Sequence, residues 1–176
     1  FGNNDTPGVM LSSAAKEYLK VYGVLVGKKP LIFTNNDSGY ETAIEFKKNG
    51  VDPIILDTRK EPKSEIIDEA KKLDIQIKFS YVVVAAKGYK KVKSAEVAKI
   101  SDDKNELGTL ENINCDCICV SGFWTPTIHL ASQSGNKTIF NKDIDAFLPG
   151  LSKQNETTLG AANGTFTLEE TLKNSF

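Results

Sequence analysis

The 176-residue sequence has few of the residues that usually carry recognisable chemistry: one histidine, one tryptophan, one methionine and three cysteines. It contains no P-loop, nucleophile elbow or metal-binding signature. No apolar run reaches about 18 residues, so no membrane-spanning helix is predicted. Lysine and arginine number 22 and aspartate and glutamate 23, which leaves no basic excess for a nucleic-acid backbone. We expect a cytoplasmic protein without nucleic-acid or membrane partners.

The first residues, FGNNDTPG, are polar and show no signal peptide. The chain also starts without methionine, and we therefore expect it to be a piece of a longer protein. Its composition, 40% hydrophobic and 26% charged, is close to that of average globular domains and predicts a packed core.

The three cysteines are spaced two residues apart, at Cys115, Cys117 and Cys119. On a strand all three would point to one face. An odd number is a poor disulfide framework, and C-x-C-x-C lacks the C-x2-C spacing of zinc sites. We therefore interpret them as small buried residues of a core strand and predict no metal site.

A strand–turn–helix–strand unit spans Lys29 to Asp57. The apolar runs PLIFT (30–34) and PIILD (53–57) read as buried strands, and the turn formers at 35–39 precede a helix that ends at Gly50. Two buried strands joined by a helix of about 11 residues must be parallel. This unit is typical of dinucleotide-binding domains.

The flanking patterns extend this α/β reading. A Thr6 N-cap with Pro7 at the first helical position predicts that a helix starts there and ends near Gly23. Further elements are expected as follows: a helix at 63–73, antiparallel strands at 75–86 and 89–100, a charged loop at 102–111, and a buried strand at 115–122. The fold class predicted is α/β: a Rossmann-like dinucleotide-binding domain with a parallel sheet plus an antiparallel β-meander.

The sequence pattern of the last third differs from that of the rest and predicts loops and short turns before a terminal helix. Thr167 and Glu170 form a T-x-x-E capping box for that helix. We interpret this tail as part of a different packing unit.

The candidate cofactor site is the helix N-terminus after the first strand, where free N–H groups and the helix dipole favour phosphate. The turn carries only one glycine, Gly39, where dinucleotide sites usually have several. Asp57 ends the second strand and either accepts ribose hydroxyls or caps the turn. Arg59 could contact a 2′-phosphate or simply be solvated. The candidate residues of the turn are Asn35, Asn36, Asp37 and Ser38.

Two features later in the sequence, His129 and the segment GAANG, are considered as functional residues. His129 follows the strand that ends at Gly122, but no partner at motif spacing accompanies it, so we assign no catalytic residue. GAANG (160–164) places small residues before a helix, which permits close backbone approach to a ligand.

Four segments together resemble one family, the alpha subunit of heterotetrameric sarcosine oxidase. They are PGVMLSSAAKEYLKVYGV (7–24), FTNNDSGYETA (33–43), VSGFWTPTIHLASQSGNK (120–137) and GAANGTFTLEETL (160–172). Their order and spacing match over nearly the whole chain.

The resemblance implies a flavoenzyme subunit in which a pyridine-nucleotide-type domain is inserted into a flavin-type dinucleotide domain. On this view 1–24 are a helical connector, 25–122 the inserted NAD(P)-binding-like domain, and 123–176 the return segment. The family oxidises sarcosine to glycine with flavin and O2 and yields hydrogen peroxide and methylenetetrahydrofolate. The partners implied are the other subunits of the complex.

The resemblance also implies cofactors. A bound NAD would use an upstream fingerprint and the segment with Gly160, Ala161, Asn163 and Gly164, while flavin and tetrahydrofolate belong to other parts of the complex. The turn at 35–38 would be a second site that has degenerated or changed ligand. Two alternatives stay open: an independent nucleotide-binding module, and a structural scaffold without catalysis.

Overall fold

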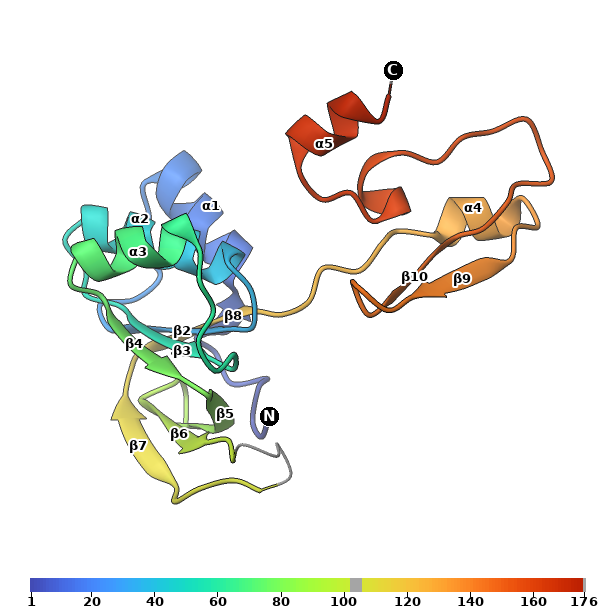
Figure 1. The fold of residues 1–176 in the computed structure, drawn as a ribbon. Helices are drawn as coiled ribbons and strands as arrows, with labels where there is room; N and C mark the ends of the chain where they lie inside the picture. The colour runs from blue at the N-terminus through green and yellow to red at the C-terminus, as the bar shows by residue number, and fades with distance from the viewer. Residues whose placement is uncertain (102–105, 176) are drawn as a thin grey trace. The chain divides into compact units, whose positions relative to one another are not determined.

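The computed structural model describes residues 1–101 and 106–175, so part of the charged loop expected at 102–111 and the last residue of the expected return segment lie outside the described residues. Contacts divide the chain into two units, 1–122 and 123–176 (Figure 1).

The first unit is built on a five-stranded parallel sheet with the strand order β1-β8-β2-β3-β4. These strands are β1 (Val9–Leu11), β2 (Pro30–Thr34), β3 (Ile54–Asp57), β4 (Gln76–Phe79) and β8 (Cys117–Ser121). The parallel pairing of β2 with β3 confirms the unit predicted between Lys29 and Asp57. The predicted α/β fold with a parallel sheet and an antiparallel meander is also confirmed.

Three helices cover one face of this sheet: α1 (Ser12–Tyr22), α2 (Ser38–Lys48) and α3 (Glu65–Lys72) (Figure 1). Their buried side chains pack on those of Ile32, Ile55 and Cys119. Tyr40 and Phe46, both fully buried, are the largest side chains of this layer. Ala43 and Ile44 complete the buried face of α2 beside these two rings.

A three-stranded antiparallel sheet covers the other face. It consists of β5 (Tyr81–Lys87), β6 (Ser94–Lys99) and β7 (Glu111–Asn114). Val83, Val92 and Val97 pack against Leu31, Leu56 and Ile118 of the parallel sheet. Because both faces are covered, the central strands β2, β3 and β8 are apolar up to the polar residues at their carboxyl ends.

Three sequence expectations for this unit are wrong. The helix predicted from Thr6 and Pro7 begins at Ser12, because Val9–Leu11 pair with β8 as an edge strand. The single strand expected at 75–86 is divided at Ser80, whose φ of 58° ends β4 and sends β5 into the second sheet. Cys115 does not share the face of Cys117 and Cys119, since it precedes β8 and packs on the opposite side.

The amino ends of β2 and β8 are joined by one side chain. The carboxylate of Asp116 accepts hydrogen bonds from the backbone N–H groups of Lys28 and Lys29, each 2.8 Å long. The Asp116 N–H donates to the carbonyl of Lys29 at 3.2 Å. These bonds fix where β2 starts relative to β8.

The second unit contains α4 (His129–Gln133), the hairpin β9 (Thr138–Asn141) and β10 (Ala146–Pro149), the 3₁₀ turn η1 (Gly160–Asn163) and α5 (Leu168–Lys173). The predicted capping box of α5 is confirmed, since the Thr167 hydroxyl accepts from the Glu170 N–H and donates to its carboxylate. The hairpin was not predicted. Among its described residues, this unit buries only small side chains, those of Pro126, Ala131 and Ala146.

The core of the first unit gives a stability prediction. Phe46→Ala removes a fully buried ring from the helix layer and should lower the free energy of unfolding by about 3–5 kcal/mol. Val21→Ala is the control, because Val21 is 66% exposed on α1 and its truncation should cost no more than about 0.5 kcal/mol. Urea denaturation followed by circular dichroism measures both, and equal losses would contradict the assigned core.

Candidate functional site

The carboxyl ends of β2, β3 and β8 meet at the N-terminus of α2. Thr34, the last residue of β2, is in register with Asp57 on one side and Ser121 on the other. The turn 35–37 follows directly and leads into α2 at Ser38. The structure thus brings together the predicted residues of the first unit at the edge where open parallel sheets bind ligands.

Asn36 is the centre of the hydrogen bonds in this turn. Its Oδ1 accepts from the backbone N–H of Ser38 at 3.0 Å, from the Ser38 hydroxyl at 2.6 Å and from the Ser121 hydroxyl at 3.2 Å. Its Nδ2 donates to the side-chain oxygen of Asn35 and to the carbonyl of Gly122. One amide side chain therefore links β2, α2 and β8.

Thr34 closes the base of the same turn. Its hydroxyl accepts from the Asn36 N–H at 3.2 Å and donates to the Asn36 carbonyl at 2.7 Å. Gly39 lies directly above it, and a Cβ at this position would come within 2.6 Å of the Thr34 Cβ and Oγ1. The one glycine of the turn is therefore required for close packing on Thr34 rather than for an unusual φ angle.

Asp57 is fully buried and its carboxylate is saturated with donors. The Tyr40 hydroxyl donates to Oδ2 at 2.7 Å, and the Arg59 backbone N–H donates to Oδ1 at 2.9 Å. The Arg59 guanidinium adds contacts of 2.8 to 3.2 Å to the two oxygens. A buried carboxylate is stable only with such partners.

Arg59 also forms an ion pair with Asp37, at 2.8 Å from Nη1 to Oδ1, and lies 5.9 Å from the centroid of the Tyr40 ring. Burial lowers the pKa of Arg59, but the carboxylates of Asp57 and Asp37 outweigh it and hold that pKa above its usual value. Burial, followed by the hydrogen bond to Asp57, raises the pKa of Tyr40 well above its usual value. Tyr40 thus stays a neutral donor and Arg59 a cation.

Two of these partners were missed by the sequence reading. Tyr40 and Ser121 are not among the candidate residues predicted from the sequence; Tyr40 lies in the helix expected after the turn, and Ser121 in the strand expected at 115–122. Arg59 was considered for a 2′-phosphate, whereas here it binds two carboxylates of its own chain. Their positions in the sequence could have identified them as site residues. Tyr40 lies in the first turn of the helix and Ser121 is the last residue of its strand, both at the carboxyl edge of the sheet.

The other predicted cofactor residues lie in the second unit. Gly160, the first residue of η1, and Gly164, which follows it, have φ angles of 65° and 77°, so the backbone favours glycine at both ends of the turn. Ala161 and Asn163 are exposed. His129 is exposed at the start of α4, and Trp124 packs on Phe166 at 6.0 Å between ring centroids.

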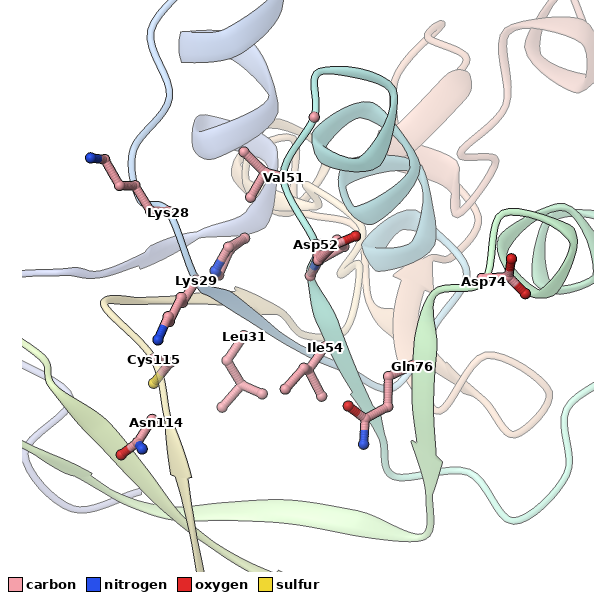
Figure 2. A pocket seen from close by; sticks show the side chains of 13 residues that line it. Lys28, Lys29, Leu31, Val51, Asp52, Ile54, Asp74, Gln76, Asn114 and Cys115 are labelled. Atoms are coloured by element: carbon pink, nitrogen blue, oxygen red, sulfur yellow. The ribbon is translucent and has the colours of Figure 1, made fainter.

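A cavity of about 520 Å³ lies at the opposite, amino-terminal edge of the parallel sheet. Figure 2 shows it between the starts of β2, β3 and β4, with Leu31 and Ile54 beside it and Cys115 and Gln76 across from each other. Burial raises the pKa of the Cys115 thiol to about 12, so this thiol is unreactive near neutral pH. The sequence reading did not predict this cavity.

Within residues 1–101 and 106–175, no group of three or more histidine, cysteine or acidic side chains is arranged to hold a metal ion. No helix in the same residues is long and apolar enough to cross a bilayer.

The fold of the chain is similar to that of thioredoxin reductases and bacillithiol disulfide reductases. A thioredoxin reductase from Lactococcus lactis superimposes with a TM-score of 0.63 at 17% identity, over 81% of this chain and 47% of that structure. Bacillithiol disulfide reductase from Staphylococcus aureus gives 0.60 at 16% identity, over 86% and 44%. At such identities the likeness defines the fold alone. No family model matches the sequence.

Sequence relatives define the chain further. It is 37% identical over 173 residues to the sarcosine oxidase subunit alpha of Rhizobium meliloti, and 32% identical over 168 residues to that of Corynebacterium sp. strain P-1. Each match covers 94% of this chain but only 16% and 17% of the relatives. The resemblance predicted from the four segments is confirmed: the chain is homologous to one segment of sarcosine oxidase alpha subunits.

The close contact between Gly39 and Thr34 gives a second prediction. Gly39→Ala forces a methyl group against Thr34 and should lower the free energy of unfolding by about 1–3 kcal/mol. Gly122→Ala is the matched control, because a Cβ there meets no heavy atom within 4 Å, and it should change stability by less than about 0.5 kcal/mol. Thermal and urea unfolding measure both, and a neutral Gly39→Ala would refute the described packing of the turn.

Proposed function

We propose that this chain is the dinucleotide-fold part of the alpha subunit of a sarcosine oxidase-like flavoenzyme. The observation that carries the proposal is the match of 93–94% of the chain, at 29–37% identity, to three proteins all named sarcosine oxidase subunit alpha. The reaction proposed for the whole complex is oxidation of sarcosine by O2 to glycine and hydrogen peroxide, with tetrahydrofolate accepting the one-carbon unit. We assign no catalytic residue to this segment.

The two units correspond to two parts of the proposed architecture. Residues 25–122 are the inserted NAD(P)-binding-like domain, and 123–176 are the return segment of another dinucleotide domain. The exposure of Leu130, Leu151 and Leu168, each at least 75%, supports this, since a unit with so little core is completed by further protein. Residues 1–24 lead into the inserted domain, although β1 and α1 pack within its sheet and helix layers.

For cofactors, we propose that NAD is held by the turn with Gly160, Ala161, Asn163 and Gly164 together with residues outside this chain. The glycines that flank this turn and the exposure of Ala161 and Asn163 support close approach of a ligand to the backbone. Flavin and tetrahydrofolate belong to other parts of the complex, and its other subunits are the proposed partners. A cytoplasmic location also stays a prediction.

A second candidate is a scaffold without catalysis. The observation that favours it is the carboxyl edge of the first unit, where Asn36, Asp57 and Arg59 bond to other groups of the chain. The two candidates differ in whether this segment can support an active complex.

Segment exchange tests the proposed function. Residues 1–176 replace the matched segment of the R. meliloti alpha subunit, which is then expressed with its partner subunits. We expect an assembled complex that produces hydrogen peroxide when sarcosine is added, because the segment is homologous to the one it replaces over nearly its whole length. Peroxide is measured with a peroxidase-coupled assay, and bound NAD is measured after acid release.

The matched control is the corresponding segment of L. lactis thioredoxin reductase, which shares the fold at 17% identity. It should fail to assemble. An exchange with residues 1–176 that assembles but oxidises no sarcosine would refute the enzyme proposal. Equal activity of the two exchanges would show that the fold alone suffices and would favour the scaffold.

A further inference from the structure

The polar groups at the carboxyl edge of the first unit leave little for a ligand to bind. At such an edge a dinucleotide places its phosphates against N–H groups at the helix start and its ribose hydroxyls on an acid at the end of the next strand. Here the N–H groups of Asn36, Ser38 and Tyr40 already donate to atoms of the turn itself. The acid, Asp57, is already bonded to Tyr40 and Arg59.

Asn36 stands in the place of a phosphate oxygen. Its Oδ1 collects one backbone N–H and two hydroxyl groups, all within 3.2 Å, and these come from the helix start and from the end of β8. A phosphate oxygen at a helix N-terminus attracts the same convergent set of donors. The amide thus satisfies the donors without a bound anion.

Arg59 stands in the place of the ribose. Its guanidinium donates to both oxygens of Asp57, while Nη1 pairs with Asp37. The Tyr40 hydroxyl and the Arg59 backbone N–H also donate to Asp57. All the acceptor positions of the two carboxylate oxygens are then occupied. Ribose hydroxyls can reach Asp57 only if the guanidinium leaves.

We propose that Asn36 and Arg59 are internal substitutes for the phosphate and the ribose of a dinucleotide, so that this edge is closed by its own side chains and accepts an adenine nucleotide only when both are removed. Arg59 is a positioning residue here, which acts by engaging Asp57 and Asp37. The inference concerns the first unit alone and does not depend on the chain being part of an oxidase.

The test is calorimetric titration of the full 176-residue chain with ADP. The wild-type chain should give no binding heat. The double variant Asn36→Gly, Arg59→Ala frees the Ser38 N–H, the hydroxyls of Ser38 and Ser121, and the positions on Asp57 that the guanidinium held. It should bind ADP with an affinity about 10- to 100-fold above the detection limit of the titration, as expected for one or two released charge-assisted hydrogen bonds. Adding Asp57→Asn to the double variant should abolish the gained binding.

Controls separate the proposed closure of the edge from the effects of a changed net charge or of unfolding. Lys72→Ala removes one positive charge from the exposed end of α3 and should leave the chain unable to bind ADP. Circular dichroism shows whether each variant is folded. If Arg59→Ala prevents folding, Arg59→Lys takes its place, because lysine keeps the charge but cannot bridge both carboxylates.

Two outcomes would overturn the inference. One is ADP binding by the wild-type chain with the affinity of the double variant, since the edge would then be open as it stands. The other is a folded double variant without ADP binding, since the two side chains would then not be what excludes the nucleotide. Neither outcome bears on the segment exchange described above, which tests the role of the chain in an oxidase.

Discussion

The arrangement of the first unit depends on the insertion of β8 between β1 and β2. The chain leaves the parallel sheet after β4, forms the antiparallel sheet, and returns as the strand that joins its two earliest strands. This return buries Ile118 on one face and Cys117 and Cys119 on the other, and it brings Ser121 to the turn after β2. Without β8, β1 would have no partner and Asn36 would lose the hydroxyl of Ser121.

Local patterns predicted the elements whose structure is decided by neighbouring residues. The strands at 30–34 and 54–57 and the helix between them follow from apolar runs and turn residues, and the capping box of α5 follows from two side chains. The errors occur where pairing with a segment distant in the sequence decides the local structure. Val9–Leu11 became a strand because β8 returns beside them, and Cys115 changed sides because its chain segment had not yet entered the sheet. No spacing rule contains that information.

The same division applies to the candidate site. The sequence predicted Asn35, Asn36, Asp37 and Ser38 as the turn after one parallel strand and Asp57 as the end of the next, and the pairing of β2 with β3 brings them to a common edge. It could not predict what these groups bond to, since Tyr40, Arg59 and Ser121 reach them through packing and register. The candidate residues of the second unit are a separate case, because their backbone angles explain the glycines whether or not a ligand binds. Their proposed role rests on homology to the alpha subunits.

The carboxylate of Asp116 lies at the amino ends of β2 and β8, at the opposite edge of the sheet from the candidate site, and it affects the geometry of that site. By holding the N–H groups of Lys28 and Lys29, it sets the register of β2 against β8. Because side chains alternate along a strand, a slip by one residue would turn Cys117 and Cys119 toward the wrong layer and would move Ser121 away from Thr34. The two hydrogen bonds of Asp116 thus support, together with the β2–β8 ladder, the alignment of polar groups at the opposite edge, and strand register couples the two ends of the sheet.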